Sequence, residues 1–129
     1  MKNKVNRYLY WTPRILSLVF AAFLMIFSFD VFDSNPGFWQ AAFALLLHNI
    51  PSFILIALTI VAWKHELVGA IGFGIFAVLF ITLSAVRIFM TESDVPAPLS
   101  AAIGPSILTV PLVIVAVLFY MNWQKKRKR

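Results

Sequence analysis

The residues of this chain that could do chemistry are ionisable and polar side chains inside long apolar stretches. His48 lies deep within one such stretch, and Asn49 and Ser52 follow it within about one helical turn. Ionisable groups at that depth are rare and often form proton relays or solute sites. The alternative is a neutral histidine that hydrogen-bonds across helices. We therefore predict an intramembrane polar site that includes His48, Asn49 and Ser52.

Arg87 is the second candidate, and Asp30 and Asp33 are its natural partners. The aspartates stand three residues apart at the end of the first apolar stretch, at about the same depth as Arg87. A structural ion pair would lower the cost of the guanidinium there. Two alternatives remain, in which Arg87 extends to the lipid headgroups or takes part in transport or binding.

Catalysis and metal binding find little support in the residue types. Paired carboxylates suggest acid/base chemistry, but no nucleophile accompanies Asp30 and Asp33. The absence of cysteine excludes thiolate nucleophiles, disulfides and cysteine-based metal sites. His65, the other histidine, belongs to the opposite membrane boundary from His48, and a single ligand does not make a metal site. We expect no enzyme activity, no metal and no cofactor.

Four apolar stretches position these side chains, at about residues 15–33, 38–63, 67–89 and 105–123. Roughly 20 helical residues cross the bilayer core, and only helices or closed barrels satisfy their backbone there. The strands of a membrane barrel would be about half as long as these stretches, and apolar and polar residues would alternate along them. A composition with 61% hydrophobic and 12% charged residues excludes a soluble core. The predicted fold is an all-α membrane protein, with residues 1–129 forming a single four-transmembrane-helix bundle.

The charges predict the orientation of this bundle. Of the eleven Lys and Arg residues, all except Arg87 precede span one, follow span four or lie between spans two and three. By the positive-inside rule these parts are cytoplasmic. We therefore expect a multi-pass plasma-membrane protein with both termini inside. The basic C-terminus, residues 125–129, is expected to contact anionic lipid in addition to anchoring the topology, and we expect no nucleic-acid partner.

Small and polar side chains predict which helix faces meet. In span two they recur every three or four residues and form a stripe: Ala41, Ala44, His48, Ser52, Leu55, Thr59 and Ala62. In span three the corresponding stripe is Ala70, Gly74, Ala77, Ile81 and Ser84. Small residues let helices approach closely in lipid, so we expect the two stripes to face protein and to meet. Pro51 predicts a kink beside His48.

A family resemblance rests on short motifs within the first three spans. They are Arg14, Phe-Ser-Phe-Asp-Val-Phe at 27–32, His-Asn-Ile-Pro at 48–51 and Ala-Trp-Lys at 62–64. This pattern resembles a family of uncharacterised small four-span bacterial membrane proteins. The resemblance implies that Asp30, His48 and Pro51 are signature positions, and it implies no activity.

Two functional classes follow from these observations. The first is a non-catalytic helix-packing or accessory subunit of a membrane assembly, either a homo-oligomer or a larger complex. The second is a small transporter or channel subunit, with a polar path that involves His48, Arg87 and Asp30. A water-accessible cavity that reaches His48 would favour the second class.

Overall fold

The chain forms four long α-helices in a computed structural model that describes residues 7–34, 37–90 and 99–128. Side chains are described for residues 7–30, 32, 37–86 and 107–128. Helix α1 covers Arg7–Phe27 and continues as the 3-10 segment η1, Ser28–Ser34. Helices α2, α3 and α4 cover Phe38–Lys64, Glu66–Met90 and Leu99–Arg127. All four contain stretches long and apolar enough to cross a membrane, which confirms the predicted fold class.

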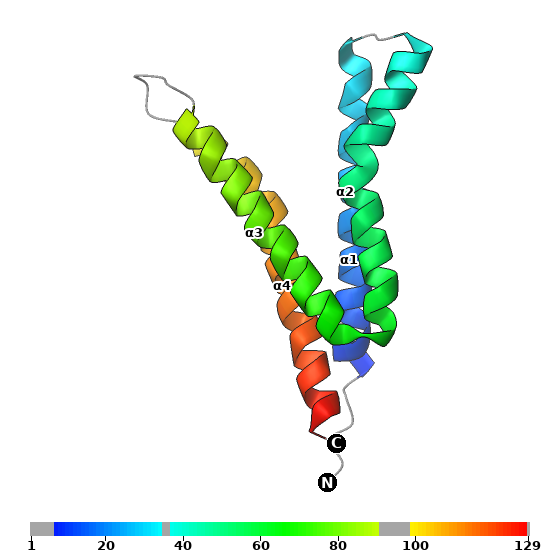
Figure 1. Cartoon of the computed structure of the whole chain (residues 1–129), viewed down its shortest axis with the longest axis vertical. Coiled ribbons are helices and arrows are strands. Elements are labelled where there is room, and N and C mark those ends of the chain that lie inside the picture. Colours follow the sequence, from blue (N-terminus) through cyan, green and yellow to red (C-terminus); the bar gives the residue numbers. More distant parts are fainter. Residues whose placement is uncertain (1–6, 35–36, 91–98, 129) are drawn as a thin grey trace.

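The helices form two hairpins that diverge from a shared end (Figure 1). Helices α1 and α2 make one hairpin, and α3 packs along α4 in the other. The start of α1 and the end of α4 lie where the hairpins meet, and the link between α2 and α3 lies there too (Figure 1). We call this part of the molecule the basic end, because Arg7, Lys64 and residues 125–128 are exposed there.

The link between the hairpins is very short. His65 alone separates α2 from α3, where a link of three residues, 64–66, was predicted. Its N–H donates to the carbonyl of Val61 at 3.0 Å. Its own carbonyl accepts from the N–H groups of Val68 and Gly69, at 3.0 and 3.2 Å. Both backbone polar groups of His65 are thus hydrogen-bonded, and they supply partners to the end of α2 and the start of α3.

Two boundaries differ from the prediction. Helix α1 starts at Arg7, about eight residues before the predicted span, because helical hydrogen bonding continues through interfacial residues that hydropathy does not count. Helix α4 starts at Leu99, about six residues before the predicted span, so that Pro105 lies inside the helix. As the seventh residue of this helix, Pro105 leaves the carbonyl of Ala101 without its usual N–H donor, yet the helix continues to Arg127.

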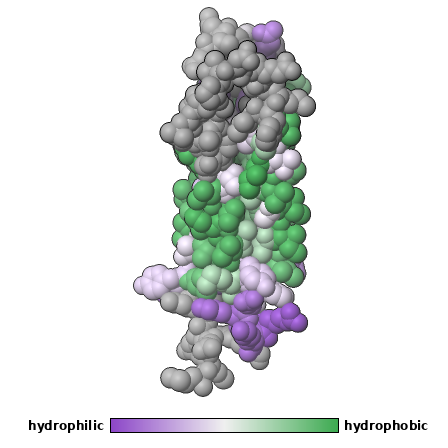
Figure 2. All heavy atoms as spheres, turned by 90° about the vertical axis from the view of Figure 1, so that its left-hand side faces the viewer, coloured by the Kyte–Doolittle hydropathy of each residue, from purple (hydrophilic) through white to green (hydrophobic). Residues whose placement is uncertain are grey.

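The apolar core lies between the middle of the bundle and the basic end. It consists of Phe20, Ala21, Leu55, Ala62, Phe73, Ala77, Leu112, Val115 and Phe119. Between 17% and 33% of the residues in each span are buried, so most of each helix surface faces outward. Figure 2 shows this surface as an apolar band with hydrophilic side chains gathered below it. Such a surface suits a lipid environment.

The predicted stripe of α2 is largely correct, whereas that of α3 is rotated. Ala41, Ser52, Leu55, Thr59 and Ala62 are buried as expected. On α3 the buried face contains Glu66, Gly69, Phe73 and Ala77, while Ile81 is exposed and a Cβ on Gly74 would meet open space. The prediction for α3 was wrong because a small side chain permits two helices to approach each other but does not by itself show that a second helix lies against it.

Candidate functional site

His48 does not lie on the protein-facing stripe, contrary to prediction. Its side chain is exposed, and its Nδ1 lies 3.0 Å from the carbonyl oxygen of Ala44 in the same helix. Asn49, the next residue, takes the buried position. One turn before Ser52, the buried position of α2 is therefore Asn49 and not His48, and the His48 side chain points away from the other helices.

Asn49 and Ser52 share the buried face of α2. The Asn49 Nδ2 donates to the carbonyl of Leu45 at 2.9 Å, while its Oδ1 and the Ser52 Oγ have no hydrogen-bond partner among the described residues. In an apolar environment a polar atom without a hydrogen-bond partner costs free energy. These two residues are the part of the predicted polar site that the structure keeps together.

The predicted pairing of Arg87 with Asp30 or Asp33 lies outside what the structure describes. The side chains of Arg87 and Asp33 are not among the described residues, and Asp30 is exposed in η1. This pairing therefore stays a prediction.

Replacing His48 by leucine is expected to change the free energy of unfolding by less than about 0.5 kcal/mol, as for other exposed positions. The histidine contacts its own helix, so the substitution removes no link between helices. Unfolding in mixed detergent micelles measures the effect. Ser52→Leu is the contrasting variant, because Ser52 is fully buried and added volume there must disturb the helix contact. A loss of stability in His48→Leu equal to that in Ser52→Leu would contradict the assignment.

The ionisable residues that the structure brings together lie instead at the basic end. The Arg14 Nη2 lies 3.1 Å from Glu66 Oε1, and Lys126 Nζ binds the same oxygen. Arg14 is 1% exposed and Glu66 4%, whereas the Lys126 side chain is 42% exposed. One carboxylate thus joins α1, α3 and α4 through two ion pairs. We call these three residues the ion cluster.

Backbone carbonyls complete the environment of Arg14. Its Nη2 also donates to the carbonyl of Trp63 at 3.1 Å, and its Nη1 donates to the carbonyl of Tyr10. Trp63 belongs to the last turn of α2, where carbonyls lack helical partners. Glu66 opens α3, where the positive end of the helix dipole favours a carboxylate. The ion cluster therefore connects all four helices.

Aromatic rings surround the two cations. The Arg14 guanidinium lies 3.7 Å from the centre of the Tyr10 ring and 5.8 Å from that of Phe119. Lys126 Nζ lies 5.4 Å from the Tyr10 ring. Phe119 stacks on Phe73 at 5.8 Å, which continues this layer into the apolar core. The rings exclude water from the ion pair and add cation–π attraction.

A proline explains a polar contact between α4 and the backbone of α1. Pro13 has no N–H, so the carbonyl of Leu9 lacks its usual partner four residues on. Asn122 Nδ2 donates to this carbonyl at 2.7 Å, and Asn122 is fully buried. Asn122 Oδ1 and Arg14 Nε are buried nearby without partners among the described residues. The amide of Asn122 thus replaces the hydrogen bond that Pro13 removes.

Replacing Asn122 by leucine is expected to lower the free energy of unfolding by about 1–3 kcal/mol, because it leaves the partly buried Leu9 carbonyl without this partner. Adding Pro13→Ala should recover part of this loss, since the alanine supplies the missing N–H within α1. The measurement is unfolding in mixed micelles of both single variants and the double variant. Strictly additive effects would show that the amide does not serve the carbonyl that Pro13 frees.

The arrangement holds helices together and offers little to a substrate. The Glu66 oxygen that both cations bind and the Arg14 hydrogen bonds are directed inward to neighbouring helices. Within the described parts of the chain, no three His, Cys, Asp or Glu residues gather as metal ligands would. The chemistry of the ion cluster is therefore charge neutralisation and helix fastening.

Sequence reasoning missed the ion cluster, although signals for it were present. Arg14 was counted as a topology cation and Glu66 as a turn residue. Glu66 is, however, the one acidic residue at a boundary otherwise occupied by Lys and Arg. Arg14 directly precedes an apolar run, where a buried partner lowers its cost. An isolated acid among cations was the signal that could have led to the pair.

The comparisons with known proteins give one match. The family described as a domain of unknown function, DUF7670, matches residues 1–129. No curated protein and no solved structure matches the chain. The match covers the first span, the ion cluster and the basic C-terminus together. This four-span chain therefore belongs to the DUF7670 family.

Proposed function

We propose that this protein is a non-catalytic helix-packing subunit of a membrane assembly. The observation that carries the proposal is how its buried charges are used. Arg14 and Glu66 are paired with each other, and Arg14 binds two backbone carbonyls. No charged group in the described interior is left over for a substrate.

The shape of the molecule supports the same proposal. The ion cluster fastens the two hairpins at the basic end, and they diverge toward the other end (Figure 1). Each hairpin then presents apolar side chains to its surroundings, among them Phe43, Phe53, Ile75 and Leu83. Helices of other subunits, or of further copies, could pack on these faces through van der Waals contact.

The transporter alternative has weaker support. Its polar path involves His48, Arg87 and Asp30, but His48 and Asp30 are exposed and the Arg87 side chain lies outside the described residues. A pH-dependent flux in proteoliposomes that His48→Leu abolishes would support transport and argue against the accessory role.

Extraction into lipid discs without detergent tests the accessory role. The expected result is a particle that contains further protein in fixed stoichiometry, either more copies of this 14.6 kDa chain or a second membrane protein. Mass measurement of single discs separates these cases. A uniform population of single chains would contradict the proposal.

We also propose that the protein lies in the plasma membrane with both termini cytoplasmic and its C-terminal cations near anionic lipid. The chain has no cysteine, so single introduced cysteines report topology directly. In intact cells we expect an impermeant maleimide to label Gly37→Cys, and to label His65→Cys only after permeabilisation. The reverse pattern would invert the orientation.

A further inference from the structure

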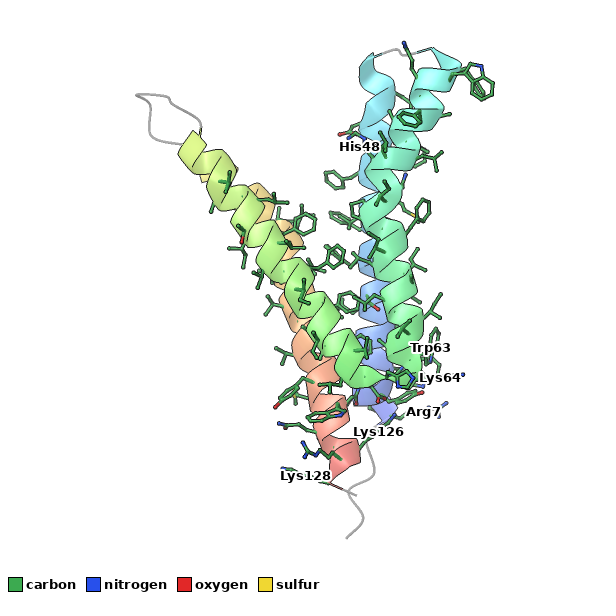
Figure 3. The ribbon with its side chains drawn as sticks, in the orientation of Figure 1. Arg7, His48, Trp63, Lys64, Lys126 and Lys128 are labelled. Atoms are coloured by element: carbon green, nitrogen blue, oxygen red, sulfur yellow. The ribbon has the colours of Figure 1, made fainter. Side chains whose placement is uncertain are left out.

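Two cations at the basic end remain available to a ligand. Arg7 opens α1 and Lys64 closes α2, and both side chains are exposed. Glu66 is already bound by Arg14 and Lys126, and no described acidic side chain pairs with Arg7 or Lys64. The two ends belong to one antiparallel hairpin, on the opposite side of the basic end from Lys128 (Figure 3).

A pair of tryptophans lies directly beside these cations. Trp11 of α1 and Trp63 of α2 contact each other edge to face, with ring centres 6.3 Å apart. They are 42% and 38% exposed, so each keeps an outward surface. Trp11 lies one helical turn after Arg7, and Trp63 precedes Lys64. Tryptophan prefers the headgroup level of the bilayer, which puts both cations at the depth of lipid phosphates.

We propose that Arg7, Lys64 and the Trp11–Trp63 pair form a binding site for the phosphate headgroup of an anionic phospholipid. The cations bind the phosphate, and the indoles line the start of the acyl chains. Charge complementarity supports this occupant, because the basic end carries a large excess of cations. The site is distinct from the C-terminus of α4, where Lys126 is engaged by Glu66 and the Arg127 guanidinium lies 5.2 Å from the Trp123 ring.

Quenching of tryptophan fluorescence by brominated lipid tests the site. The chain has four tryptophans, so Trp39→Phe with Trp123→Phe leaves only the proposed pair. This background protein is reconstituted into phosphatidylcholine vesicles that contain equal fractions of either brominated phosphatidylglycerol or brominated phosphatidylcholine. We expect stronger quenching by the anionic lipid. Arg7→Gln and Lys64→Gln should each lower the relative association constant about fivefold.

A matched pair of substitutions separates a local site from general surface charge. Lys125→Gln with Lys128→Gln removes two cations from the end of α4, as Arg7→Gln with Lys64→Gln does from the proposed site, and here the preference for anionic lipid should persist. Arg7→Lys with Lys64→Arg should also keep it. If the Arg7/Lys64 and the Lys125/Lys128 glutamine variants lost the preference for anionic lipid equally, the proposal would be overturned, because general electrostatic attraction to the membrane would then explain the binding. The absence of any preference in the background protein would overturn it as well.

Discussion

Glu66→Gln is expected to lower the free energy of unfolding by about 3 kcal/mol or more, because it leaves the buried Arg14 guanidinium without a counter-charge. Arginine cannot shed its proton to relieve this cost. Lys126 should contribute less, since its partly exposed side chain can turn to water. Unfolding in mixed detergent micelles without anionic lipid measures the effect.

A double-mutant cycle tests whether the cost arises from the pair itself. Adding Arg14→Gln to Glu66→Gln should cost less than the sum of the two single changes, with a coupling of about 1–3 kcal/mol. Arg7→Gln is the matched control, because Arg7 is an exposed arginine in the same helix and should change stability by less than about 0.5 kcal/mol. Additive single effects would show that the ion pair does not fasten the bundle.

Gly69→Ala is expected to cost about 1–3 kcal/mol by overpacking. A Cβ on Gly69 would lie 2.5 Å from the Cβ of Ala62 and 3.2 Å from ring atoms of Phe119. The Ala62 methyl is fixed to the backbone of α2, so relief requires α2 or α3 to move. Because this contact lies beside the link at His65, the substitution should loosen the junction of the two hairpins.

Two other glycines of α3 serve as internal controls for Gly69. A Cβ on Gly74 would meet nothing within 4 Å, so Gly74→Ala should be neutral or stabilising by up to about 1 kcal/mol through helix propensity. The three atoms nearest to a Cβ on Gly72 all belong to the flexible end of Leu58, the first at 2.5 Å, and an intermediate effect is expected. Thermal unfolding in detergent measures the order of stability of the three alanine variants. Equal effects at Gly69 and Gly74 would contradict the close approach of α2 and α3.

Where helices lie could largely be predicted from the sequence. Helices α2 and α3 begin and end within one residue of the predicted spans, because the apolar run and the helix coincide there. The buried face of α2 was also predictable from Ser52 to Ala62. The prediction was wrong at His48, because Asn49 is also polar and is the next residue in the helix. Spacing alone could not decide which of the two residues is buried.

Membrane insertion is a property of each segment by itself, so span number and length are readable from composition and from the rise of a helix. The partners of buried polar groups are not readable in this way. Arg14 binds Glu66 across 52 residues, and Asn122 reaches Leu9 across 113. In lipid, apolar burial barely distinguishes one helix rotation from another, so close contacts and polar pairs decide it. The sequence by itself therefore determined a four-span helical membrane protein, and only the tertiary structure decided which of its charges are buried and which helices they join.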